Sequence, residues 1–165
     1  MPNPNAKYFV AESIARKPWS GPVIDIGAGE YTNYYRDLFG STEYLTLDFK
    51  QNSKSNIQLI ADLLDMKQIQ KNHYGIALLL ETLEHVKDPF LAFLKISQIL
   101  RPGGMFICTT VAAWPQHDHP ADYWRFLMAG LELLCEHANL KVFHRKQTTA
   151  ATQIPCQVMI AAIKP

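Results

Sequence analysis

The sequence lacks a long apolar run, a run of basic residues and any closely spaced pair of cysteines. Without about 18 consecutive apolar residues it has no candidate membrane-spanning helix, and its first seven residues are too polar for a signal peptide. Cys108, Cys135 and Cys156 lie too far apart for a Cys-x-x-Cys metal or redox motif. These absences predict a cytoplasmic protein with no membrane partner, whose cysteines are small buried residues.

The chain also lacks an excess of charge of either sign. Sixteen basic residues nearly balance fifteen acidic residues, which gives a net charge of +1. A nucleic-acid surface normally shows as a basic patch or stripe, so no nucleic-acid partner is expected and a small neutral or acidic substrate fits better. The length of 165 residues and the hydrophobic content of 48% predict one globular domain. Residues 1–20 would carry a leading helix, and residues 21–165 an α/β core.

Hydrophobic patterning predicts strands and helices in alternation. Expected helices cover 6–16, 30–39, 64–71, 89–100 and 127–138, and expected strands cover 23–26, 44–48, 57–61, 75–80, 105–111, 141–145 and 156–163. The segment 75–80 is apolar throughout, as in a strand covered on both faces. Asp88-Pro89 is typical of a helix start, and the helix after it should bury Phe90, Phe93, Leu94 and Ile96. This alternation predicts an α/β fold with a mainly parallel sheet.

A glycine-rich turn follows the first expected strand. Residues 23–29 read Val-Ile-Asp-Ile-Gly-Ala-Gly, and Asp48 ends the next strand. In open α/β sheets such glycines let the backbone approach a nucleoside, and an acid about 20 residues further on binds the ribose hydroxyls. The pattern predicts a nucleoside-binding site.

Three further segments carry a family resemblance. They are Leu83-Glu84-His85-Val86, Ile99-Leu100-Arg101-Pro102-Gly103-Gly104 and the stretch from His119 to Phe126. With the glycine turn, the chain resembles the class I S-adenosylmethionine-dependent methyltransferases, specifically their small-molecule (type 11-like) branch. The resemblance implies a single-domain, Rossmann-like doubly wound sheet of about seven strands. Its last strand would be antiparallel and would lie between the fifth and sixth.

The resemblance also implies a set of residues that bind the cofactor, S-adenosylmethionine. The glycine turn would face the methionine part of the cofactor. The acid after the second strand would face the ribose, and the pair after the third strand would face the adenine. The pair after the fourth strand would lie beside the methyl group. The residues are Asp25, Gly27, Ala28, Gly29, Asp48, Phe49, Asp62, Leu63, Glu81 and Thr82. Asp25 could instead act chiefly on the amides of the turn.

Two positions depart from the family pattern. Tyr31 replaces the third glycine of the first motif, which suggests that Tyr34, Tyr35 and Arg36 close over the cofactor. Gly75 replaces an acid at the start of the fourth strand, which we expect to affect structure rather than chemistry.

A histidine-rich loop at 112–124 supplies candidate catalytic residues. Methyl transfer mainly requires alignment, and a base is needed only for a hydroxyl or a protonated amine. We expect His119 or His117 to act as a general base or substrate contact, with Asp122 and Arg125 orienting their neighbours. Alternatively, Asp122 and Arg125 together with Tyr123 only cap and pin the following helix.

We expect no metal in this loop. His117-x-His119 with two aspartates also fits a divalent-metal site, but its acids do not obviously match those of metal-dependent methyltransferases. Glu84 and His85 are expected to be structural.

The predicted activity is methyl transfer to a small-molecule acceptor, with O-methylation of a sugar-like metabolite preferred. A nicotinamide-dependent oxidoreductase is disfavoured, because Thr32 stands where the dinucleotide fingerprint has glycine. A non-catalytic S-adenosylmethionine-binding protein is the other alternative, suggested by Tyr31. The sequence leaves a homodimer open.

Overall fold

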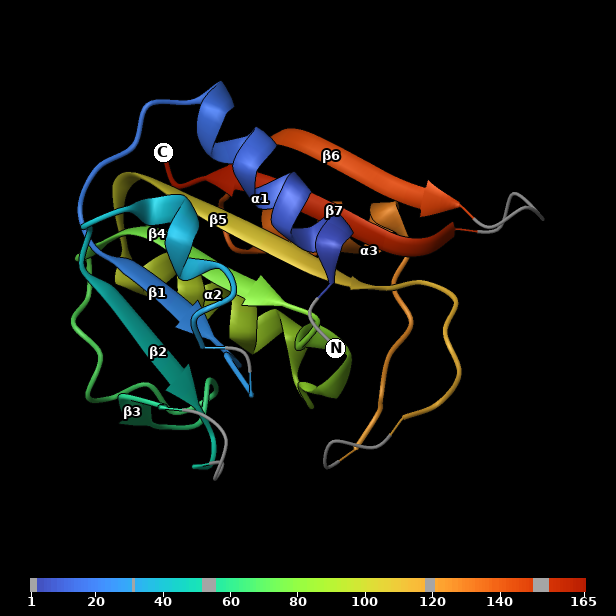
Figure 1. Ribbon diagram of the computed structural model, residues 1–165. Coiled ribbons are helices and arrows are strands. Elements are labelled where there is room, and N and C mark those ends of the chain that lie inside the picture. Colours follow the sequence, from blue (N-terminus) through green and yellow to red (C-terminus); the bar gives the residue numbers. More distant parts are fainter. Residues whose placement is uncertain (1–2, 31, 52–55, 118–120, 150–154) are drawn as a thin grey trace.

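A computed structural model describes residues 3–30, 32–51, 56–117, 121–149 and 155–165 (Figure 1). The elements follow the predicted alternation for most of the chain. In order they are α1 (Pro4–Arg16), β1 (Val23–Ile26), the 3-10 helix η1 (Arg36–Phe39), β2 (Tyr44–Asp48), β3 (Leu59–Ile60), β4 (Tyr74–Leu80), the 3-10 helix η2 (Leu83–His85), α2 (Pro89–Ile99), β5 (Leu100–Val111), α3 (Met128–His137), β6 (Lys141–Thr149) and β7 (Pro155–Ile163).

The strands form one seven-stranded sheet in the order β3-β2-β1-β4-β5-β7-β6. The first five of these strands pair in parallel, whereas β7 is antiparallel to both of its neighbours. The last strand of the chain therefore lies between the fifth and the sixth. This confirms the predicted Rossmann-like fold class and the predicted place of the antiparallel strand.

Helices cover both faces of the sheet. α1 and η1 pack on one face with Val23 and Ile76, while α2 and α3 pack on the other with Ile24 and Ala77. Neighbouring strand residues face opposite sides of a sheet, so a strand covered on both faces must be apolar at every position. β4 fits this rule, because all seven of its residues are buried. Figure 1 shows α1 on one side of β5 and β7, with α3 on the other.

The start of α2 matches the prediction, but its buried face is narrower than predicted. The Asp88 carboxylate accepts a hydrogen bond from the Leu91 amide at 2.9 Å and caps the helix. Phe93 and Ile96, three residues apart on one face, are fully buried. The prediction that Phe90 belongs to the core is wrong, because its side chain is 42% exposed on the outer face of the first turn.

The predicted helix at 30–39 is reduced to the short helix η1. The aromatic residues before it pack inward instead of forming a regular helical face. Tyr35 is buried beneath α1, and Arg36 lies over the Tyr44 ring with its guanidinium carbon 5.6 Å from the ring centroid. Gly40, with a φ of 55°, ends the segment. Tyr35 and Arg36 are thus held by the α1-side core. Tyr31 lies outside the described residues.

The predicted strand at 57–61 and helix at 64–71 are also shorter than expected. The Gln58 side chain accepts the Thr46 amide hydrogen at 3.0 Å, so a side chain replaces a ladder bond and β3 spans only two residues. The prediction of a helix at 64–71 is wrong. The Asp62 carboxylate accepts from the Leu64 amide at 2.8 Å, and such a bond competes with helix formation. Two turns follow, and they bury Leu63 and Ile69.

Among the described residues, no helix is both long enough and apolar enough to cross a membrane.

Gly75 is required by the close approach of the loop before β1. A Cβ at this position would lie 1.8 Å from the backbone oxygen of Ser20, which a small shift cannot relieve. Where the family pattern has an acid, this chain therefore needs a glycine for packing.

We expect Gly75→Ala to lower the free energy of unfolding by more than about 2 kcal/mol, because the added carbon forces the backbone apart. Gly130→Ala is the matched control. It lies in α3, where the nearest atom to an added Cβ is 3.8 Å away, so the helix should gain up to about 1 kcal/mol. Urea denaturation measures both, and equal stabilities of the two variants would contradict the prediction.

Candidate cofactor and acceptor site

The carboxyl end of β1 turns sharply through Gly27, Ala28 and Gly29. Gly27 and Gly29 have φ values of 72° and 56°, which favour glycine. The amides of Gly27 and Ala28 both donate to the Leu47 carbonyl, at 2.8 and 3.2 Å, so the turn is held against the end of β2. The glycine turn is therefore a fixed feature at the carboxyl end of β1.

Thr82, just after β4, packs against this turn. Its hydroxyl donates to the Leu80 carbonyl at 3.0 Å and lies 3.4 Å from the Gly27 carbonyl. A Cβ at Gly27 would lie 2.3 Å from the Thr82 hydroxyl oxygen. The ends of β1 and β4 thus meet so closely that only glycine fits.

Asp48 closes the glycine turn. Its carboxylate accepts a hydrogen bond from the Gly29 amide at 2.9 Å, and only 8% of the residue is exposed. Asp25, the alternative candidate for this contact with the turn amides, instead accepts a hydrogen bond from the Tyr44 hydroxyl at 2.8 Å. Phe49 follows Asp48 with half of its surface exposed.

Asp25 is a buried carboxyl group at the same edge. Burial raises its pKa to about 7, the Tyr44 hydrogen bond opposes this, and the charge of Asp48 adds to it. A group of this kind favours its neutral form in the folded protein.

Asp62 lies one strand further along the edge. It comes two residues after the end of β3 and is exposed, whereas its neighbour Leu63 is buried. Because Asp48 pairs with Ile60 in the β2–β3 ladder, Asp48 ends β2 and Asp62 lies two residues beyond the end of the adjacent strand. One Asp62 oxygen accepts from the Leu64 amide.

Glu81 has a strained backbone and a fixed side chain. Its φ is 50°, a conformation that residues with a side chain rarely adopt outside functional sites. One carboxylate oxygen accepts from the Thr109 hydroxyl and from the Gln157 amide group, both at 2.7 Å, and the other lies 3.4 Å from the Asn3 amide nitrogen. None of these three partners was predicted from the sequence. Thr109 could have been found from the sequence, because Thr109-Thr110 is a polar pair that closes an apolar strand.

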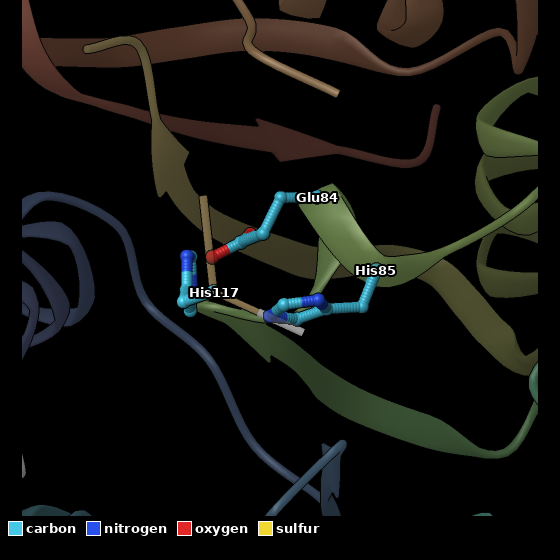
Figure 2. Close-up of side chains that lie close together, drawn as sticks. All are labelled: Glu84, His85 and His117. Atoms are coloured by element: carbon cyan, nitrogen blue, oxygen red, sulfur yellow. The ribbon is translucent and has the colours of Figure 1, made fainter. Parts of the chain in front are cut away.

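Glu84 and His85 in η2 lie close to His117, from the loop after β5 (Figure 2). Glu84 is buried, with 1% of its surface exposed, and accepts from the Thr110 hydroxyl at 2.8 Å. Burial and the nearby charge of Glu81 raise the Glu84 pKa to about 7. The rings of His85 and His117 meet edge to face with centroids 4.9 Å apart.

Asp122 and Arg125 form a clamp on the segment before α3. The guanidinium donates two hydrogen bonds to the carboxylate, at 2.5 and 2.6 Å, and the His117 amide donates a third at 2.9 Å. These bonds hold the pKa of Asp122 well below its usual range. Its side chain is fully covered. Asp122 is thus placed to orient His117 and the loop.

Asp118 and His119 lie outside the described residues, so the catalytic role expected for His119 stays a prediction.

Comparison with known proteins identifies the class. Residues 6–147 match the family model described as a methyltransferase domain, so the chain belongs to this family. The predicted enzyme class, the S-adenosylmethionine-dependent methyltransferases, and the predicted cofactor are thereby confirmed. No curated protein sequence matches the chain.

Solved structures with low sequence identity share the fold. The 1,6-didemethyltoxoflavin-N1-methyltransferase of Burkholderia thailandensis, solved with S-adenosylhomocysteine, is 15% identical (TM-score 0.75), with coverage of 98% of this chain and 77% of that one. A Haloferax volcanii methyltransferase in complex with the activator Trm112 is 18% identical (TM-score 0.70, 96% and 89%). The [4+2]-cyclase SpnF is 14% identical (TM-score 0.72, 98% and 80%).

We expect Asp25→Asn to change how stability depends on pH. Because folding raises the Asp25 pKa from 3.8 to about 7, the stabilisation of its protonated form is complete below about pH 4 and is lost as the pH rises to 7. The amide, which carries no charge, should make the protein more stable than wild type at pH 8, by on the order of 1–3 kcal/mol. Urea denaturation from pH 5 to 8 measures the slope. The exposed Asp37→Asn is the control, and parallel curves for wild type and Asp25→Asn would contradict the prediction.

Proposed function

We propose that this methyltransferase acts on a small-molecule acceptor, and that it methylates an oxygen of a sugar-like compound. The observation that carries the proposal is the convergence of a glycine cradle, the carboxylates of Asp48 and Asp62, and a histidine-bearing loop at one sheet edge. Ligands of open α/β sheets bind at this edge.

The cradle fits the cofactor in two respects. A Cβ at Gly29 would have only the Gly27 carbonyl oxygen within 4 Å, at 3.9 Å, so this side of the turn is open, and Asp62 offers an exposed carboxylate just beyond the next strand but one. When bound, S-adenosylmethionine supplies a methyl group that its sulfonium charge already activates.

In this proposal each segment binds one part of the cofactor. Asp48 accepts hydrogen bonds from the ribose hydroxyls, with Phe49 beside it, and Asp62 and the Leu63 amide bind the adenine. The glycine turn, supported by Asp25, lies along the methionine part. Glu81 and Thr82 lie nearest to the methyl group, where a fixed carboxylate favours a positive charge.

His117 is the described residue best placed to contact the acceptor. Its Nδ1 lies 3.2 Å from the Pro115 carbonyl, and since a carbonyl only accepts, Nδ1 carries the proton. Nε2 is then the basic nitrogen of the neutral ring. We propose it as an acceptor contact or general base, with Asp122 as its positioning residue and His119 as the further candidate.

The net charge of +1 supports a small acceptor over a nucleic acid. A screen of polyols, sugars and RNA for release of S-adenosylhomocysteine tests the acceptor class. Turnover with RNA alone would contradict the proposal.

The compartment and the assembly state are also proposals. The buried thiols of Cys108 and Cys135 support a cytoplasmic location, which cell fractionation checks. Light scattering decides whether the chain forms a homodimer.

Replacing Asp62 should weaken cofactor binding without unfolding the protein. We expect Asp62→Ala to bind S-adenosylhomocysteine about tenfold more weakly, because a charge-assisted hydrogen bond to the adenine is lost. Asp48→Asn, which keeps an oxygen for the Gly29 amide, should weaken binding at least as much. Calorimetric titration measures both.

Asp65→Ala is the matched control, since Asp65 is exposed in the same loop and binds only Lys67 at 3.3 Å. Equal affinities of Asp62→Ala and Asp65→Ala would contradict the assignment of the adenine site. Binding of NADH in place of S-adenosylhomocysteine would contradict the proposed cofactor site. Cofactor binding without turnover on any acceptor would favour a non-catalytic binding protein.

A further inference from the structure

Glu84, His85 and His117 bring one carboxylate and two imidazoles together at the acceptor side of the sheet edge. One nitrogen or oxygen from each lies within 4.8 Å of the others (Figure 2). Atoms that bind one ion at about 2.1 Å are about 3.0–3.5 Å apart, so small side-chain rotations would bring all three onto a common ion. The three come from two separate segments, η2 and the loop after β5.

Backbone carbonyls set the tautomer of both histidines. The Nδ1 of His85 lies 2.7 Å from the Ala121 carbonyl, and the Nδ1 of His117 lies 3.2 Å from the Pro115 carbonyl. Because a carbonyl oxygen only accepts, both Nδ1 atoms donate, and in each neutral ring the lone pair is on Nε2. Metal-binding histidines show this same arrangement, in which the second nitrogen donates to a carbonyl or a carboxylate.

The charge around Glu84 also favours a cation. Glu84 is buried and close to the fixed carboxylate of Glu81. In the part of the chain that the structure describes, no lysine or arginine forms an ion pair with either, and the nearby Arg125 is bound by Asp122. The hydroxyls of Thr110 and Thr109 donate to these two carboxylates but bring no positive charge, and a cation would relieve the remaining cost of burial.

We propose that Glu84, His85 and His117 form a site for a divalent transition-metal ion that binds the methyl acceptor through oxygen. Two imidazoles and one carboxylate suit zinc, manganese, cobalt or iron(II) better than magnesium, which prefers oxygen ligands. Three protein ligands leave positions open for an oxygen of the acceptor. This ligand set differs from the one that the sequence suggested, His117 and His119 with two aspartates. In the structure Asp122 is bound by Arg125, and Glu84 supplies the carboxylate.

The ion would act on the acceptor hydroxyl, and this role rests on the proposed function. Thr82 contacts the glycine turn and lies two residues before Glu84, so the ion lies beside the cofactor crevice. Binding to a divalent ion lowers the pKa of a hydroxyl, whose proton then passes to solvent water. His117 is a ligand in this arrangement and not the general base.

The test is binding of Co²⁺ to the full chain after EDTA treatment and dialysis. We expect one Co²⁺ per chain, detected by its visible absorption and by calorimetry, with Mg²⁺ bound more weakly. His117→Ala should bind Co²⁺ at least about tenfold more weakly. Replacing a residue that only hydrogen-bonds a metal ligand already weakens binding by about this much, and His117 is itself a ligand. Glu84→Gln, which keeps an oxygen for the Thr110 hydroxyl, should do the same.

His137→Ala is the matched control, because His137 is exposed on α3 and meets the Phe90 ring edge to face. Circular dichroism shows whether each variant folds. Replacing His117 should disturb folding less than replacing the buried Glu84, since a third of the His117 side chain is exposed. With an acceptor that supports turnover, EDTA should lower the rate of methyl transfer. Mn²⁺ or Co²⁺ should then restore the rate in His137→Ala but not in His117→Ala.

No Co²⁺, Mn²⁺ or Zn²⁺ binding to wild type would overturn the metal site, as would equal Co²⁺ affinity of His117→Ala and His137→Ala. Turnover indifferent to EDTA would overturn the role of the ion. Titration with S-adenosylhomocysteine is run in parallel. Its failure with wild type would count against the proposed function, whereas failure of Co²⁺ alone would count only against the metal site.

Discussion

The packing of Gly27 against Thr82 is the contact on which the rest of the site depends. It brings the ends of β1 and β4 together so closely that a single added carbon would lie 2.3 Å from the threonine hydroxyl. Through this contact the glycine turn, which Asp48 closes, is joined to the segment that carries Glu81, Glu84 and His85. The two halves of the edge therefore form one rigid unit, and rigidity of this kind is what an alignment-driven reaction requires.

The same edge gathers acidic side chains. Asp25, Asp48, Glu81 and Glu84 are largely buried there, and among the described residues none of them pairs with lysine or arginine. Tyr44, Thr109 and Thr110 donate hydrogen bonds to three of them, which reduces the cost of burial without neutralising the charge. Such an edge suits ligands that bring positive charge, and the sulfonium of the cofactor is one of them.

Where the sequence-based predictions fail, a local interaction competes with the pattern. Leu63, Met66 and Ile69 repeat every three residues and suggest a helix, but the Asp62 side chain binds the Leu64 amide and turns bury the same residues. Tyr35 likewise interrupts the helix expected at 30–39, because it packs beneath α1. At the site, the sequence points to Glu81, yet its partners Gln157 and Asn3 come from the far end of the chain and from the leading segment. No local pattern marks residues whose role comes from a distant contact.

By itself the sequence determined the alternation of strands and helices, the glycine turn, the acid after β2 and the family, because these depend on short-range periodicity and on spacing within one βα unit. Tertiary structure alone decided that Thr82 fills the space beside Gly27, that Gln157 binds Glu81, and that Glu84 and His85 meet His117. These contacts join segments that belong to or follow different strands, and their geometry is set by how the sheet brings its strand ends together.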